Sequence, residues 1–368
     1  MSDGCCEPRE DKSCCAPEKN QGSAPGKEQS CCPGSGDAVC LARAISQVTS
    51  RITASDRVDH LLARWGINRA GHRVEPGLYS LGEPDEDSPV YVTANYTLSF
   101  DALRSALDGA DCYILVLDTR GINVWCAAGK GTFGTDELVG RIESTGLASV
   151  VTHRDLVLPQ LGAPGVSAHE VLRSSGFKVT YGPVRASDLT EFTRAGRANA
   201  EMRRVRFGLA DRLVLVPVEL VHVLLPCLAA AVVLYFLAGP LAAWSAVVSL
   251  VAGAVLFPAL MPVLPTPNFS TKGFVLGLVV ALPFAAAAFT GHAHSSTWVR
   301  LGWPLVYLLG MPQVVSFLAL NFTGSSTFTS RTGVKREIAA YFPPMVWTFG
   351  AAVVLLVALS AARLFGGQ

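Results

Sequence analysis

The C-terminal half of this 368-residue chain is so apolar that it limits the possible folds more than any motif does. From residue 213 onward it holds six Lys or Arg residues and two Asp or Glu residues. A helix needs roughly 20 mostly apolar residues to cross a bilayer. Gly, Pro and polar residues divide this half into five runs of about that length, at 214–237, 241–263, 273–290, 302–321 and 344–364. We therefore predict an all-α transmembrane domain of five helices over residues 213–366.

The distribution of basic residues predicts how these helices are oriented. Basic residues gather before the first span, after the second and after the fourth: Arg194, Arg197, Arg203, Arg204, Arg206, Arg212, Lys272, Arg331, Lys335 and Arg336. Because Lys and Arg are retained on the cytoplasmic side, we expect a multi-pass protein of the cytoplasmic (inner) membrane. Its N-terminal domain would lie in the cytoplasm, its C-terminus outside, and residues 196–212 would form a basic linker. The formal net charge of +1 gives no basic surplus that would indicate nucleic-acid binding.

Residues 1–40 are rich in Gly, Pro, Ser, Lys and Glu and hold seven of the ten cysteines. Such a segment buries too little apolar surface to offset the entropy of ordering, so we predict a disordered Cys-rich tail without a signal peptide. Six of its cysteines form adjacent pairs: Cys5, Cys6, Cys14, Cys15, Cys31 and Cys32. Thiolates are soft ligands, so capture of soft metal ions is one interpretation, and solvated thiols without a metal are the other. No CxxC occurs in the chain, which argues against an iron–sulfur cluster of its own.

Residues 41–195 alternate between apolar runs typical of strands and amphipathic runs typical of helices. The expected strands are 90–94, 112–117, 149–152 and 178–181. The expected helices are 41–65, 100–107, 135–144, 167–174 and 186–195. Strands separated by helices imply a Rossmann-like α/β domain with a parallel sheet, and such sheets bind ligands at the carboxyl ends of their strands.

The loop after the second expected strand, residues 121–134, is the most informative segment at that edge. Asn123 is a natural N-cap, so Val124 to Lys130 can form a short helix that Gly131 or Gly134 ends. Cys126 then occupies the third helical position, where unpaired amides and the helix dipole favour an anion. The loop lacks the spacing of a phosphate-binding motif. The residues alone leave two possibilities for Cys126, a reactive thiol or a buried structural one. For His153 they favour a structural role over that of a catalytic base.

The residues 123–130, NVWCAAGK, resemble the cap-helix signature of the mercury-methylating corrinoid protein family (HgcA) at all eight positions. The similarity extends through residues 92–96, 131–134, 158–163 and 181–183, and the five spans agree with that family's membrane domain. It covers about residues 85–366. The paired cysteines of the tail are not part of the family pattern.

The resemblance implies a corrinoid-binding domain related to that of the corrinoid iron–sulfur protein. It implies that Cys126 ligates cobalt from the lower face of a cobalamin-type corrinoid, which is methylated in the active state. The residues expected to contact the cofactor are Thr93, Asn123, Val124, Trp125, Cys126, Ala127, Ala128, Gly129, Lys130, Gly131, Thr132, Gln160, Gly162, Gly165 and Val166.

The same resemblance implies an anaerobic methyltransferase that passes a methyl group from cobalt to Hg(II). The methyl group would come from a methyl donor protein or a methyl-tetrahydrofolate system. A ferredoxin-like partner with two [4Fe-4S] clusters would supply the electrons that reduce cobalt, because this chain has no cluster motif of its own. Two other functions stay open: a corrinoid methyl carrier in one-carbon metabolism of the acetyl-CoA pathway type, and a non-enzymatic membrane protein that binds or transports metal.

Overall fold

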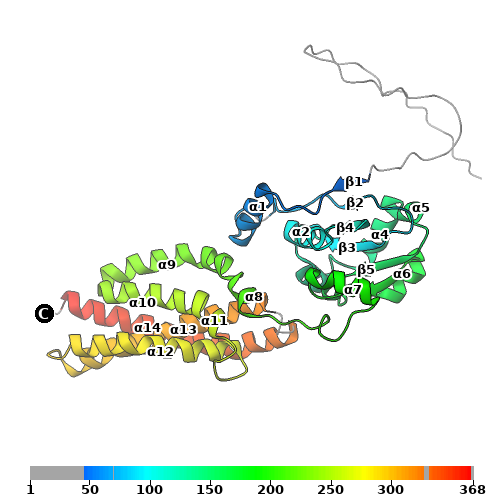
Figure 1. Ribbon diagram of the computed structural model, residues 1–368. Coiled ribbons are helices and arrows are strands. Elements are labelled where there is room, and N and C mark those ends of the chain that lie inside the picture. Colours follow the sequence, from blue (N-terminus) through cyan, green and yellow to red (C-terminus); the bar gives the residue numbers. More distant parts are fainter. Residues whose placement is uncertain (1–44, 69, 327–330, 366–368) are drawn as a thin grey trace, which may run out of the picture. The chain divides into compact units, whose positions relative to one another are not determined.

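The computed structural model describes residues 45–68, 70–326 and 331–365 (Figure 1). These residues form an α/β domain followed by helices, five of which are long and apolar enough to cross a membrane. Both parts of the predicted fold class are thereby confirmed. The predicted tail, with its three pairs of cysteines, lies outside the described residues.

The described part of the α/β domain contains a six-stranded sheet with the strand order β1-β2-β4-β3-β5-β6. Its strands are β1 (Ser46–Val48), β2 (Gly77–Leu81), β3 (Val90–Ala94), β4 (Cys112–Leu117), β5 (Asp155–Leu158) and β6 (Lys178–Tyr181). Every residue of β3 and β4 is buried, as expected for central strands covered on both faces. All neighbouring pairs run parallel except β2 and β4, which are antiparallel.

Helices cover both faces of the sheet (Figure 1). They are α2 (Thr97–Ala106), α3 (Val124–Lys130), α4 (Thr135–Thr145), α5 (Leu147–Val150), α6 (Ala168–Ser175) and α7 (Leu189–Ala195). A further helix, α1 (Ala54–Arg64), has no buried residue and belongs to neither core. Alternate residues of a strand point to opposite faces. Accordingly, Val92 and Leu115 pack with α3, α4 and α6 in one core, whereas Tyr91 and Ile114 pack with α2 and α7 in the other.

Three details of the expected secondary structure were wrong. The expected helix at 41–65 begins only at Ala54, because Thr53 and Asp56 form a capping box there, and residues 46–48 pair with β2 as an edge strand instead. Strand β2 itself was not expected. The expected strand at 149–152 is displaced to β5, because Gly146 in the left-handed region (φ 63°) starts the short helix α5. The alternation of buried residues that marks the true strand lies in residues 155–158.

The five long apolar helices match the five predicted spans in number and order. They cover Leu209–Ala238, Pro240–Leu260, Phe269–Gly291, Thr297–Ser325 and Thr332–Leu364. The second of these contains a π-helical turn at Ala252–Leu256. The third and fourth pack closely at two glycines: a Cβ added to Gly273 or Gly277 would lie 2.5 Å from an atom of the facing helix. Small residues at such contacts are typical of helices packed in membranes.

Candidate functional site

The short helix α3 stands at the carboxyl end of β4 and carries the residues of the NVWCAAGK segment. Its N-cap is Asn123, whose side-chain oxygen accepts a hydrogen bond from the Cys126 amide at 2.9 Å. Its C-cap is Gly131, in the left-handed region at φ 85°, whose amide donates to the carbonyls of Ala127 and Ala128. The helix predicted from the sequence is therefore confirmed at both ends.

Helix α3 is anchored by small side chains and presents a thiol. Val124, Ala127 and Ala128 are buried in the core that covers this face of the sheet. Trp125 and Cys126 are half-buried, and the Cys126 thiol forms no disulfide. The packing side of the helix therefore holds it against the sheet while the thiol stays accessible.

Asn95 fixes the loop that leads from β4 into α3. It lies at the carboxyl end of β3 and is only 1% exposed. Its side-chain oxygen accepts hydrogen bonds from the Thr119 amide (3.0 Å), the Thr119 hydroxyl (2.9 Å) and the Gly121 amide (3.0 Å). Its side-chain nitrogen donates to an Asp118 carboxylate oxygen at 3.2 Å.

Asn95 was not predicted as a site residue. The signal that could have found it is a polar side chain that directly follows a strand whose five residues are all buried. A buried polar group is tolerated only where it is hydrogen-bonded, so an Asn at that position indicates a loop that must be held.

The loop at 158–166 packs against the C-terminal end of α3 with no room for larger residues. A Cβ added to Gly162 would lie 2.6 Å from the Phe133 ring. A Cβ added to Gly165 would lie 2.9 Å from Ala128 Cα and closer still to the Phe133 carbonyl oxygen. Val166 is buried, and its carbonyl accepts a hydrogen bond from the Tyr181 hydroxyl at 2.6 Å. These three residues have a packing role, and their contact with a cofactor stays a prediction.

Two of the predicted contact residues carry a buried polar atom that lacks a partner within the described part of the chain. They are Thr132, through its hydroxyl oxygen, and Gln160, through its side-chain carbonyl oxygen. An unpaired buried polar atom costs about 1–3 kcal/mol. A ligand with polar groups on its rim, such as the amides of a corrin ring, would supply the missing partners. The donor and acceptor set at this edge therefore fits a corrinoid.

A hollow of the α/β domain lies at the carboxyl ends of β3 and β5. Its walls in this domain include four predicted residues, Thr93, Asn123, Val124 and Trp125, next to the apolar residues Val157, Leu158, Pro159 and Leu161. The other predicted residues do not line it. Gly129, Lys130 and Gly131 are exposed at the far end of α3. The structure thus places the predicted residues along α3 and its two caps, on the loop beside it and, for Thr93, in β3.

Other ionisable groups of the domain have structural roles. His153 faces the Ser88 carbonyl at 2.9 Å and accepts a hydrogen bond from the Asp155 amide at 3.1 Å. Burial raises the pKa of the Cys112 thiol to about 12, so it is no nucleophile. No group of three or more His, Cys, Asp or Glu side chains suited to a metal occurs within the described ranges.

Comparison with known proteins finds similarity within the α/β domain. Residues 67–193 match the family model CdhD, described as the CO dehydrogenase/acetyl-CoA synthase delta subunit. The matched segment runs from the end of α1 to α7 and includes all of the predicted contact residues.

Individual relatives agree with this match. The acetyl-CoA decarbonylase/synthase complex subunit gamma of Methanopyrus kandleri is 39% identical over 126 residues, 34% of this chain and 27% of the relative. The corrinoid/iron-sulfur protein large subunit of Moorella thermoacetica is 30% identical over 157 residues, 40% of this chain and 35% of the relative. The chain thus spans about a quarter to a third of the length of these relatives. The expected similarity to the corrinoid iron–sulfur protein is confirmed, and the similarity to the mercury-methylating family rests on the sequence motifs.

Proposed function

We propose that this chain is a membrane-anchored corrinoid protein that transfers methyl groups, with Cys126 as the lower axial ligand of cobalt. The observation that carries the proposal is the accessible thiol of Cys126 on a helix capped at both ends, in a domain similar to corrinoid proteins. When bound, the corrinoid supplies a cobalt centre that accepts and gives up a methyl group.

The residues of the chain hold the ligand and its surroundings in place. The Asn123 side chain accepts a hydrogen bond from the Cys126 amide, and Asn95 holds the preceding loop by hydrogen bonds. The backbone that carries the thiol therefore has little freedom. Thr132 and Gln160 would donate to and accept from polar groups on the corrin rim. Thr93, buried at the end of β3, would pack near the ring and adjust the donor strength of the thiolate.

The proposed methyl acceptor is Hg(II), with methylmercury as the product. This part of the proposal rests on the resemblance of residues 123–130 to the mercury-methylating family. Hg(II) is an electrophile, so it needs a methyl group that arrives with its bonding electrons. A thiolate is a strong electron donor and therefore suits this direction of transfer better than a neutral imidazole does.

Three partners follow from the proposal. A ferredoxin-like protein with two [4Fe-4S] clusters would supply the electrons that reduce cobalt. A methyl donor protein or methyl-tetrahydrofolate system would supply the methyl group. The lipid bilayer would hold the five apolar helices, with the α/β domain in the cytoplasm and the C-terminus outside.

A second candidate function is a methyl carrier in one-carbon metabolism of the acetyl-CoA pathway type. The comparisons favour it, because the family model and the relatives are named for acetyl-CoA complexes. Both functions use the same cofactor and the same cysteine. Only the identity of the methyl acceptor separates them.

The test is anaerobic reconstitution of the full chain with methylcobalamin, followed by addition of Hg(II). We expect a thiolate-bound cobalt spectrum and methylmercury from the wild type. Cys126→Ala should abolish both, and Cys126→His should sharply reduce methylmercury. The matched control is Cys227→Ala, which removes another free, half-buried thiol.

The possible outcomes separate the two functions. A spectrum that Cys126→Ala leaves unchanged would contradict cobalt ligation by this residue. A normal spectrum without methylmercury, combined with methyl transfer to a protein acceptor, would favour the carrier. The same assay on a chain that lacks residues 1–40 tests whether the paired cysteines capture Hg(II).

A further inference from the structure

Helix α1 is amphipathic, yet it turns its apolar side away from the domain. None of its residues is buried. Val58 and Leu61 are each 56% exposed, and Trp65, which caps the helix, is 41% exposed. Their spacing of three and four residues places them in one stripe along the helix. Ile67, which is 51% exposed, follows this stripe in the next turn of the chain.

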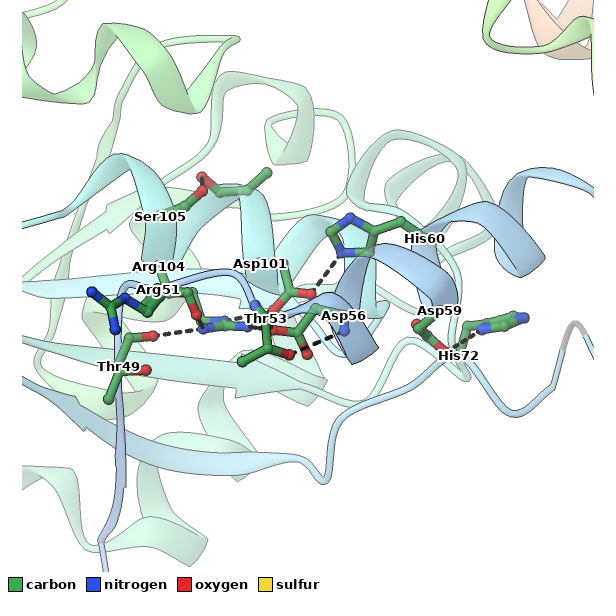
Figure 2. Close-up of polar contacts among 11 residues, drawn as sticks. Thr49, Arg51, Thr53, Asp56, Asp59, His60, His72, Asp101, Arg104 and Ser105 are labelled. Carbon is green, nitrogen blue, oxygen red and sulfur yellow. Dashed lines mark hydrogen bonds and ion pairs between the residues drawn. The ribbon is translucent and has the colours of Figure 1, made fainter.

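The polar side of α1 faces the domain and is held by Arg104 of α2 (Figure 2). The Arg104 guanidinium donates to the carboxylates of Asp56 at 2.8 Å and Asp101 at 2.6 Å. It also donates to the carbonyls of Thr49 at 2.6 Å and Arg51 at 2.8 Å, just before the helix. Arg104 is 7% exposed and Asp101 is 3% exposed, so this ion pair is buried, whereas the Asp56 side chain is 26% exposed.

Two histidines complete the attachment (Figure 2). His60 of α1 contacts Asp101 at 2.7 Å. His72, after the helix, contacts the Asp59 carboxylate at 2.7 Å with one ring nitrogen and the Ile67 carbonyl at 2.6 Å with the other. With 3.6 residues per turn, the attached residues lie on the side of α1 opposite to the apolar stripe. The attachment therefore keeps the stripe pointing outward.

The chain itself holds this domain close to the apolar helices. Met202 is 4% exposed within a core of the α/β domain, and its carbonyl accepts a hydrogen bond from the Val184 amide at 2.8 Å. Phe207 is 9% exposed within a core of the apolar helices. The residues 203–206 that join them can reach at most about 18 Å when fully extended. If the helices cross a bilayer, the α/β domain is held at its surface.

The residues around the stripe match the chemistry of a lipid surface. Trp is enriched at the level of the headgroups, where its ring has apolar and polar neighbours. Arg57 and Arg64 lie along one edge of the stripe on α1, and Arg residues occupy three of the four positions in 203–206. Basic side chains are attracted to anionic lipid headgroups at such a surface.

We propose that helix α1 binds the surface of the bilayer, with the stripe of Val58, Leu61 and Trp65 inserted among the headgroups. A short helix with an apolar stripe bordered by arginines binds lipid through both apolar burial and charge. The α/β domain then has two attachments to the membrane, the residues 203–206 and helix α1. The proposal does not depend on the cofactor or the methyl acceptor.

The test is photocrosslinking with the full chain reconstituted in vesicles of phosphatidylcholine and phosphatidylglycerol. p-Benzoylphenylalanine replaces Leu61 in one variant and Leu172, a leucine of α6 that is 50% exposed, in the matched control. A third variant carries it at Leu225 in the first apolar helix, where 76% of the residue is exposed. We expect lipid adducts at positions 61 and 225, several-fold more than at position 172.

Each outcome decides the proposal. Lipid adducts at 225 but not at 61, equal yields at 61 and 172, or protein adducts in place of lipid at 61 would overturn it. Absence of adducts at 225 would contradict the membrane assignment itself. As a second measurement, Leu61→Asp should increase hydrogen exchange in residues 54–67 in vesicles and leave the corrinoid spectrum unchanged, because Leu61 is exposed. Unchanged exchange in this variant would also overturn the proposal.

Discussion

Asn95 offers a sharp test of how the cap helix is positioned, because one side chain serves several partners. Replacing it with alanine removes the acceptor of the Thr119 and Gly121 amides and the donor to Asp118. The Thr119 amide is buried, so it cannot turn to bulk water, whereas the Thr119 hydroxyl keeps the Ile122 carbonyl at 2.6 Å as an acceptor. We therefore expect the loop at 118–123 to loosen and α3 to lose its fixed approach to the sheet.

The size of the effect follows from the number of amides left without a partner. Each costs about 1–3 kcal/mol, and water that enters the space left by the side chain offsets part of that cost. We expect Asn95→Ala to lower the free energy of opening this loop by about 2–4 kcal/mol. At 1.4 kcal/mol for each factor of ten, the loop amides should exchange about 30- to 700-fold faster.

The assay is hydrogen exchange by mass spectrometry on peptides that cover residues 116–126 of the full chain. Asn95→Asp keeps the acceptor but places a second carboxylate beside Asp118, so it should also speed exchange. Adding Asp118→Asn restores a donor across this contact in the reverse direction and should recover at least half of the lost protection. Unchanged exchange in Asn95→Ala, or a double variant no better than Asn95→Asp, would refute the role of Asn95.

Three further predictions test the packing, the attachment of α1 and the state of the thiols. Gly165→Ala should destabilise the α/β domain by about 1–3 kcal/mol through overpacking. The control Gly140→Ala, which has no atom within 4 Å of the added Cβ, should not lower the apparent Tm. Equal effects of the two substitutions would contradict the packing argument. Burial works against the charged form of His72, but the carbonyl and the carboxylate at its ring outweigh burial and raise its pKa above 6.5. The stability that His72 adds is therefore complete below pH 6.5 and is lost as the pH rises through the raised pKa. Hydrogen exchange in α1, corrected for its intrinsic rate, should become faster over that pH range in the wild type. It should not do so in His72→Gln. Iodoacetamide at pH 8 should alkylate Cys126 well before Cys112, whose thiol is buried and whose pKa is raised to about 12; the reverse order would show that the thiol of α3 is covered.

The parts of the fold that could be predicted are those whose signal is local. The five apolar runs, the buried strands β3 and β4, and the cap helix with Asn123 and Gly131 are each visible within a few residues of sequence. The edge strand β1 and its neighbour β2 could not be predicted in the same way. Their pairing joins residues far apart in the chain, and the apolar spacing at 41–52 fits a helix as well as a strand.

The same distinction holds for the site. The thiol at the third position of α3 followed from the cap residue and the spacing. The anchoring by Asn95, and the packing of Gly165 on Ala128, depend on segments brought together only by the fold. The polar attachment of α1 was missed for a further reason. An amphipathic pattern predicts a helix but not which of its sides faces the protein.

The alanines of α3 have a consequence for the geometry of the thiol. Ala127 is fully buried and Ala128, which packs on Gly165, is 5% exposed, so small side chains hold this helix close to the core beneath it. The elevation of the Cys126 sulfur above the sheet is thus set by the smallest side chains that can still fill a core. A bulkier residue at either position would move the sulfur away from the sheet, toward a group bound above it. These alanines therefore determine how much space a planar ring has above the helix.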